Sequence, residues 1–342
     1  MHDLRGAKRS LKDRIPWRAL GIAASLVVIA AAFVVLYRML YDIDLREVVA
    51  AIRTTSPYEL VLAGVFVAIA YFTLTFYDYF ALRTIGRNEV PYRVAALASF
   101  TSYSIGHNVG FSVVSGGTVR YRVYTGSGLS GIEVAKICFI AGLTFWLGNL
   151  AVLGLGAAFD PVSASAIDRL PLAFNRGIGI AILVALAGYV LWVSMAPRTF
   201  GRDNWTVTLP GGKLTFLQIL IGIVDLACAT AAMYVLMPDR PNIDFVSLMV
   251  IFVSATLLGF ASNSPGGLGV FDAAMLLALP LFDKEDLVGA LLLFRLYYYV
   301  VPFALALAII GIRELLIDLP WVSAKIIHPP DKAGTERKKP GS

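Results

Sequence analysis

Charge is scarce in this sequence, because Asp, Glu, Lys and Arg make up only 15% of its 342 residues while 58% are hydrophobic. A soluble domain of ordinary size carries more surface charge than this. The composition therefore excludes such a domain as the main part of the chain. It predicts an all-α polytopic membrane protein.

Residues that commonly carry chemistry are also few. Cys138 and Cys228 fall inside predicted spans, where a thiol acts as a small apolar side chain. His2, His107 and His328 are scattered and predict no metal cluster. No GxxxxGK[ST] loop for ATP is present, and the net charge of +6 is interpreted as a topology signal rather than a nucleic-acid surface. We expect no cofactor and no nucleic-acid partner.

Long apolar segments are present instead, and about 20 such residues in a helix cross a bilayer. The first is too long for a signal peptide and is interpreted as a retained helix. Two further apolar regions, Tyr92–Val114 and Phe245–Leu281, are associated with glycine pairs. The predicted crossings are Trp17–Tyr41, Pro57–Arg83, Ser130–Phe159, Leu172–Ala196, Leu214–Met237 and Leu287–Arg313.

The glycine pairs, Gly116-Gly117 and Gly266-Gly267, lie at matching places in the two halves of the chain. A helix that breaks inside a bilayer frees backbone polar groups, which only protein or a water-filled cavity can satisfy. Paired broken helices of this kind are typical of transporter binding sites. We therefore expect a broken or re-entrant helical hairpin in each half.

Lys and Arg are distributed unevenly between the two sides of the predicted membrane. Most belong to the ends of the chain and to three connections, and the positive-inside rule makes that side cytoplasmic. Tyr92–Val114 is then a hairpin entered from the cytoplasm, while Phe245–Leu281 starts and ends outside as a hairpin or as two crossings. The opposite side holds Arg46, Arg53, Arg169, Arg176, Arg240 and Lys284.

This order of segments predicts two inverted-topology repeats, 17–160 and 161–315, between a basic cytoplasmic segment 1–16 and a disordered basic tail 316–342. One pair of connections departs from the repeat. Leu45 to Ile52 form an apolar stripe that predicts an interfacial helix, whereas Arg198 to Lys213 are interpreted as a polar loop.

Charged residues also lie well inside some of the predicted spans. Asp78 lies near the cytoplasmic end of its helix and Asp225 near the middle of its own. An intramembrane carboxylate costs on the order of 3 kcal/mol, so it usually has a partner or a function. Arg295 needs a carboxylate such as Asp225 or Asp272, a backbone carbonyl or a lipid phosphate.

The residues around the two breaks allow a structural and a functional interpretation. Arg120 and Arg122 follow the inner break and are either cytoplasmic charges or phosphate ligands. The outer break, Asn263 to Gly267, is either a tight turn or a source of carbonyls for an ammonium group.

These features together resemble the flippase domain of the multiple peptide resistance factor family, the aminoacyl-phosphatidylglycerol synthase/flippase proteins. The resemblance covers roughly residues 15 to 315. It rests on Tyr77-Asp78, Ser115-Gly116-Gly117, Arg120-Tyr121-Arg122, Asp225, Ser264-Pro265-Gly266-Gly267-Leu268-Gly269, Asp272, Arg295 and Tyr298.

The resemblance implies a flippase that moves lysyl- or alanyl-phosphatidylglycerol from the inner to the outer leaflet of the bacterial cytoplasmic membrane. In the family this lipid reduces negative surface charge and gives resistance to cationic antimicrobial peptides. The sequence ends before the family's synthase part, so we expect a trimmed form or a stand-alone relative. A stand-alone relative would carry another amphiphile, such as a hopanoid or polyprenyl lipid.

The predicted substrate is a membrane phospholipid, whose phosphate the arginines would bind and whose ammonium the aspartates would bind. A lipid synthase domain or protein is a further expected partner, and homo-oligomerisation is left open. The rival interpretations are a membrane enzyme acting on lipid and a purely structural subunit. The predicted binding residues are Asp78, Ser115, Gly116, Gly117, Arg120, Arg122, Asp225, Asn263, Ser264, Pro265, Gly266, Gly267, Asp272, Arg295 and Tyr298.

Overall fold

A computed structural model describes residues 34, 46, 53, 55–202 and 205–317. The predicted first crossing, Trp17–Tyr41, lies outside the described residues. So do the basic segment 1–16, nearly all of the predicted interfacial stripe and nearly all of the predicted tail. The repeat boundaries stay predictions.

Five helical segments of the described chain are long and apolar enough to cross a membrane. They correspond to the remaining predicted crossings and confirm the all-α polytopic class. They are α3 (Pro57–Thr84), α6 (Gly131–Phe159), α8 (Leu172–Met195), α9 (Gly212–Leu236) and a composite helix within which Lys284–Arg313 is the span.

Two of these helices begin at capping boxes that are visible in the sequence. The Ser56 hydroxyl accepts from the Tyr58 amide, and the Glu59 carboxylate accepts from the Ser56 amide at the start of α3. Ser130 and Glu133 form the same motif at the start of α6. Such reciprocal bonds satisfy amides that have no partner within the helix.

The composite helix contains α12 (Lys284–Arg295), a π-helical turn (Leu296–Val300) and α13 (Val301–Ile317). Pro302 has no amide hydrogen, so it cannot bond to the Tyr298 carbonyl one turn earlier. The Tyr71 hydroxyl of α3 donates to that carbonyl at 2.9 Å instead. The irregular turn is therefore joined to α3 in the membrane interior.

Each predicted broken region forms a hairpin of two shorter helices. The inner hairpin consists of α4 (Tyr92–Val109) and α5 (Ser112–Thr125). The outer hairpin consists of α10 (Phe245–Ala261), a 3-10 turn (Pro265–Gly267) and α11 (Val270–Ala278). For the outer region, where charge counting allowed two full crossings, the structure shows a hairpin.

The position of the inner break corrects the prediction. Gly116 and Gly117 lie within α5, and the chain turns at Gly110 (φ 83°) and Phe111 (φ 46°). Gly116 serves helix packing, because a β-carbon there would lie 3.1 Å from the Ser102 carbonyl oxygen of α4. The outer break lies where it was predicted.

The connection from α8 to α9 also differs from its prediction as a polar loop. It contains an antiparallel pair of strands, β1 (Thr199–Arg202) and β2 (Trp205–Thr208). Val207 is buried, and the Trp205 ring packs edge-on against Phe139 with centroids 5.7 Å apart. Alternate residues of β2 thus dock the hairpin onto α6.

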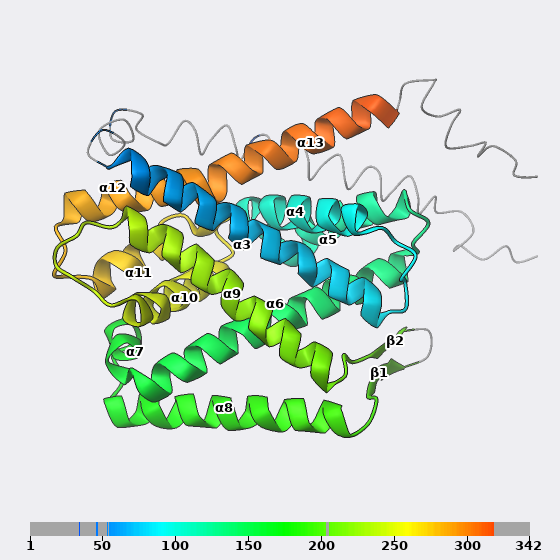
Figure 1. The fold of residues 1–342 in the computed structure, drawn as a ribbon, viewed down its shortest axis with the longest axis horizontal. Helices are drawn as coiled ribbons and strands as arrows, with labels where there is room; N and C mark the ends of the chain where they lie inside the picture. Colours follow the sequence, from blue (N-terminus) through cyan, green and yellow to red (C-terminus); the bar gives the residue numbers. More distant parts are fainter. Residues whose placement is uncertain (1–33, 35–45, 47–52, 54, 203–204, 318–342) are drawn as a thin grey trace, which may run out of the picture.

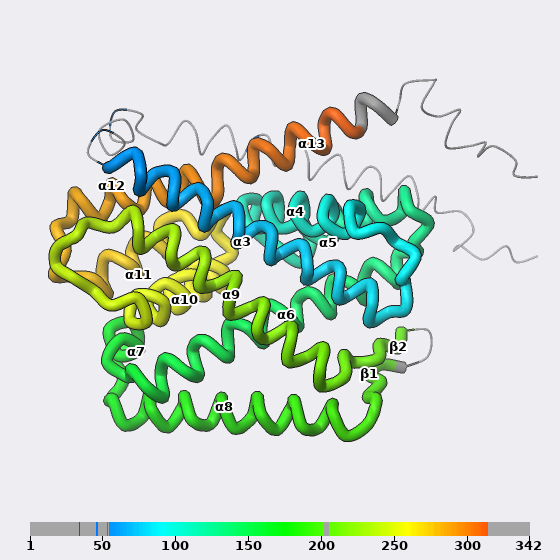
Figure 2. Tube along the Cα trace, viewed as in Figure 1, coloured from blue at the N-terminus to red at the C-terminus, as the bar shows by residue number. Residues whose placement is uncertain are grey.

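The helices are arranged so that the two hairpins enter from opposite ends (Figures 1 and 2). The β-hairpin marks one end, together with the connections at 85–91 and 126–130 that flank the inner hairpin. The short helix α7 (Pro161–Asp168) marks the other end, together with the start of α12. The arrangement is what an inverted repeat would produce, and the repeat itself stays a prediction.

The tips of the two hairpins touch. A β-carbon on Gly110 would lie only 2.8 Å from the carbonyl oxygen of Asn263, so the breaks are in backbone contact. Helices α3 and α9 lie side by side across the middle of the molecule (Figure 1).

Helix α9 crosses α6 at a glycine pair. A β-carbon on Gly148 would lie 2.7 Å from the Cα atom of Gly222. Small residues let membrane helices approach in this way and gain close packing. Gly222 lies almost one turn before Asp225, so this contact positions the intramembrane carboxylate.

We predict that Gly148→Val lowers the free energy of unfolding by about 1–3 kcal/mol, the usual cost of overpacking. The matched control is Gly142→Val in the same helix, because a β-carbon there meets no atom within 4 Å. Thermal unfolding in detergent should show a lower midpoint for Gly148→Val only. Equal midpoints for the two variants would contradict the crossing at Gly148.

Candidate functional site

The two helix breaks enclose a cavity in the middle of the membrane region. It is lined by the inner break (Gly110, Phe111, Ser112), the outer break (Asn263, Ser264, Gly266, Gly267) and Asp225 of α9. Its volume is about 60 Å³. A buried water needs at least about 10–15 Å³, so the cavity has room for a few waters and must widen for a larger ligand.

Asp225 lies near the midpoint of α9, as predicted, and only 5% of it is exposed. The Tyr77 hydroxyl donates to its carboxylate at 3.1 Å, and the Thr73 hydroxyl lies 3.3 Å away. The Thr73 hydroxyl also lies 2.6 Å from the Ala70 carbonyl, so its one hydrogen is shared. Within the described chain, Asp225 forms no salt bridge.

Aromatic rings line the same cavity as this carboxylate. The face of an aromatic ring attracts cations, most strongly where water is excluded. A cavity with one carboxylate and many rings therefore suits an ammonium group. The rings come from the inner break and four helical elements: Phe111, Phe145, Phe252, Phe260, Phe271, Tyr298 and Tyr299.

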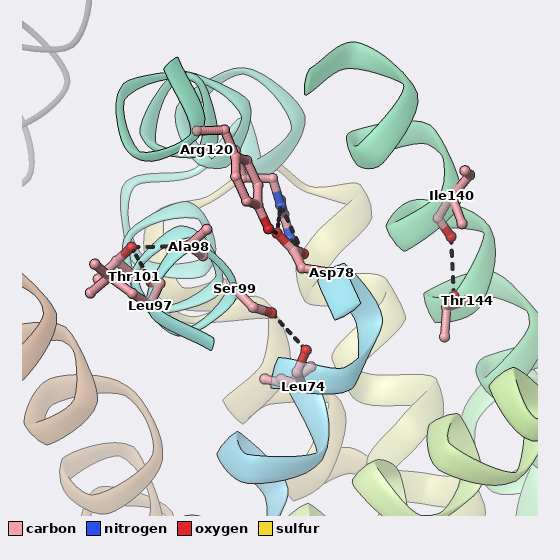
Figure 3. A network of polar contacts seen from close by, with 10 residues as sticks. Leu74, Asp78, Leu97, Ala98, Ser99, Thr101, Arg120, Ile140 and Thr144 are labelled. Carbon is pink, nitrogen blue, oxygen red and sulfur yellow. Dashed lines mark hydrogen bonds and ion pairs between the residues drawn. The ribbon is translucent and has the colours of Figure 1, made fainter. Parts of the chain in front are cut away.

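The inner hairpin is attached to α3 by a buried ion pair (Figure 3). Arg120 of α5 donates from Nε to both oxygens of Asp78 at 3.0 Å and from Nη2 to Oδ1 at 2.8 Å. The Tyr124 hydroxyl donates to Asp78 at 2.9 Å, and the guanidinium lies 4.8 Å from the Tyr103 ring centroid. Asp78 has no exposed surface. Arg120 can reach a phosphate only if this pair opens.

The outer hairpin is attached to α12 by a second ion pair. Arg295 donates from Nη2 to Asp272 of α11 at 2.6 Å and from Nη1 to the Gly266 carbonyl at 3.3 Å. Asp272 also accepts from the Gly269 amide at 3.1 Å, which caps α11. Of the partners open from the sequence for Arg295, the structure shows two, the Asp272 carboxylate and a backbone carbonyl.

The structure separates the predicted site residues into two groups. Asp225, Tyr298 and four residues of the outer break line the cavity, and Ser115 supports the inner break by donating to the Gly110 carbonyl at 2.9 Å. The other predicted residues lie outside the cavity lining, with Arg122 in the last turn of α5. They are Asp78, Gly116, Gly117, Arg120, Arg122, Pro265, Asp272 and Arg295.

Sequence reasoning missed the contribution of the inner break to the cavity. Phe111 and Ser112 line it, as does His107 of α4. A signal was present, since Gly110-Phe111 resembles Gly259-Phe260 in the other half. The donor Tyr77 was also missed as a ligand of Asp225, because the two lie on different helices.

Comparison with known proteins gives consistent matches over the membrane region. The family described as "Lysylphosphatidylglycerol synthase TM region" matches residues 20–306. The Synechocystis protein slr0712 is 33% identical over 75% of this chain and 80% of its own length. Inner membrane protein YbhN of Escherichia coli is 29% identical over 86% of this chain and 93% of its own.

A longer relative matches only in part. The phosphatidylglycerol lysyltransferase of Staphylococcus aureus is 25% identical over 80% of this chain. The match covers 32% of that enzyme. This chain therefore resembles the flippase part of such a protein.

The buried pair at Asp78 predicts a specific pattern of stabilities. Arg120→Met leaves a buried carboxylate without its cation, which should cost about 3–5 kcal/mol. Removing both charges with Asp78→Asn and Arg120→Met should recover most of that loss. Arg83→Met, an exposed change on α3, should stay within about 0.5 kcal/mol of the parent.

Chemical or thermal unfolding of the purified variants checks this pattern. If the double variant is as unstable as Arg120→Met alone, electrostatic pairing with Asp78 is not what Arg120 contributes.

Proposed function

Because the chain belongs to the lysylphosphatidylglycerol synthase transmembrane-region family, we propose that it is a phospholipid flippase. In this proposal it moves a lipid with a cationic headgroup, lysyl- or alanyl-phosphatidylglycerol, from the inner to the outer leaflet of the bacterial cytoplasmic membrane. Display of that lipid would lower the negative surface charge and contribute to resistance against cationic antimicrobial peptides. The end that carries the β-hairpin would face the cytoplasm.

The observation that carries the proposal is the isolated carboxylate of Asp225. A charge inside a membrane protein is costly unless a partner compensates it, and this one has only hydroxyl donors among the described residues. The ammonium group of an aminoacyl ester would supply the missing positive charge. The aromatic lining would add cation–π attraction.

A phosphate could be placed in the same cavity. Ser112 begins α5, and no side chain caps that helix at Phe111. The first amides of a helix and its dipole favour an anion. A headgroup with one phosphate and an ammonium would thus find both kinds of partner, on α5 and α9.

The two hairpins suggest how the cavity could open to each leaflet in turn. Each hairpin enters from one end and is held by an ion pair, the buried Arg120–Asp78 or the partly buried Arg295–Asp272. Opening one pair while the other stays closed would expose the cavity to one side only. The sequence contains no ATP-binding loop, so an ion or lipid gradient would drive the movement, or it would run downhill.

A second candidate is transport of another amphiphile, such as a hopanoid or polyprenyl lipid. The Synechocystis and Escherichia coli relatives match over most of their own length, unlike the lysyltransferase. A hopanoid without a cationic group would have no use for Asp225. A membrane enzyme is less well supported, because the described residues contain no His, Cys, Asp or Glu cluster able to hold a metal. We also propose a lipid synthase as a functional partner.

We predict that Asp225→Asn reduces transport of lysyl-phosphatidylglycerol by about tenfold or more, equivalent to at least about 1.4 kcal/mol. The amide keeps the size and the bond from Tyr77 but loses the charge. Asp225→Glu should keep more activity than Asp225→Asn. Transport is measured in proteoliposomes with an impermeant amine reagent that labels ammonium groups in the exposed leaflet.

The control is Asp286→Asn, an exposed position near the start of α12, which should leave transport unchanged. Parental transport by a well-folded Asp225→Asn would reject the ammonium site. If phosphatidylglycerol without the aminoacyl group is transported as fast as lysyl-phosphatidylglycerol, and Asp225→Asn changes neither rate, another amphiphile is favoured as the substrate.

A further inference from the structure

A second and larger hollow lies outside the central cavity, between α5 and α6. This groove has a volume of about 780 Å³ and a mainly apolar lining. Thr118 lies in it, but its hydroxyl donates to the Val114 carbonyl of its own helix at 2.8 Å. The Thr118 hydroxyl has its hydrogen-bond partner within α5, so the groove can still accept hydrocarbon at this point.

Glycines hollow out this groove. Gly117 of α5 and Gly131 and Gly142 of α6 all line it. A β-carbon on Gly142 would meet no atom within 4 Å, and one on Gly117 would meet only the Cys138 sulfur at 3.7 Å. Larger side chains would fit at both positions, so close helix packing does not require glycine there.

The groove is long enough to cross one leaflet. Along α6 it extends from Gly131 to Trp146, about 22 Å at the helical rise of 1.5 Å per residue. Half of the hydrocarbon core measures about 15 Å. The groove therefore runs from the end of the molecule at which the inner hairpin enters to the middle of the membrane region.

The inner end of the groove adjoins the central cavity. Ser112 and Phe145 line the cavity, and the next residues, Val113 and Trp146, line the groove. Val113 is 76% exposed, so the wall of α5 is open on this side. A single amphiphile could thus place a polar group by Asp225 and an apolar chain between α5 and α6.

We propose that the groove between α5 and α6 binds an acyl chain of a phospholipid while its headgroup occupies the Asp225 cavity. This inference rests on the proposed function for the headgroup and for the cytoplasmic side. The groove is then the lateral entry from the inner leaflet. Hydrocarbon is the occupant because the groove offers little polar surface to hold water and because lipid chains surround a membrane-spanning helix at this depth.

Photo-labelling tests the occupant directly. The protein is reconstituted with phosphatidylglycerol that carries a diazirine on one acyl chain, irradiated and analysed by mass spectrometry. Residues 113–121 and 134–146 should be labelled several-fold more than the exposed face of α8, where Ile180, Val184 and Leu191 also face outward. Equal labelling of the two surfaces would mean ordinary boundary lipid and would overturn the proposal.

Filling the groove provides the matched test. Gly142→Phe and, from the opposite wall, Gly117→Leu should each reduce groove labelling several-fold and slow lipid transport. Gly188→Phe on α8 is the control, because a β-carbon there also meets no atom within 4 Å. Unchanged labelling and transport in both groove variants would overturn the inference, even if Asp225-dependent transport stands.

The two proposals fail separately. Specific groove labelling without transport of any lipid would leave the acyl-chain site standing and reject the flippase. Cysteine cross-linking at position 139 to a second copy, with loss of lipid labelling, would show a protein occupant and reject the acyl-chain site.

Discussion

The organisation of this protein centres on one carboxylate held in the middle of the membrane without a cation. Among the described residues, Asp225 receives hydrogen bonds only from hydroxyl groups of α3 and forms no salt bridge. The glycine contact between α6 and α9 fixes its position, and the broken helices surround it. An energetic deficit of this kind would be offset by a cationic ligand, and this supports the proposal that a lipid headgroup binds here.

The other intramembrane charges named above form ion pairs between helices. Asp78 with Arg120 is a buried ion pair and Asp272 with Arg295 a partly buried one, and each ties a hairpin to a neighbouring helix. Removing one partner of such a pair strongly destabilises the protein, whereas the intact pair contributes little net stability. Such a pair is suited to open and close in the proposed transport cycle.

The sequence predicted the five crossings within the described residues and the outer break, because long apolar runs and a Pro-Gly-Gly turn have direct physical consequences. It misplaced the inner break, since Gly116-Gly117 resembles a break but lies within α5, where Gly116 packs closely against α4. The true turn uses Phe111 in a left-handed conformation, which no composition rule indicates. Asp78 and Arg120 were identified singly, but their mutual contact depends on how α5 folds back onto α3.

The proposed binding of a lipid's cationic headgroup to Asp225 can be tested by the thermal midpoint of the purified protein. The midpoint is measured with added lysyl-phosphatidylglycerol or phosphatidylglycerol, for the parent and Asp225→Asn. If Asp225 binds the headgroup, only the aminoacylated lipid raises the midpoint of the parent, and neither lipid raises that of the variant. Equal stabilisation by the two lipids, or stabilisation of the variant by lysyl-phosphatidylglycerol to the parental extent, would contradict it.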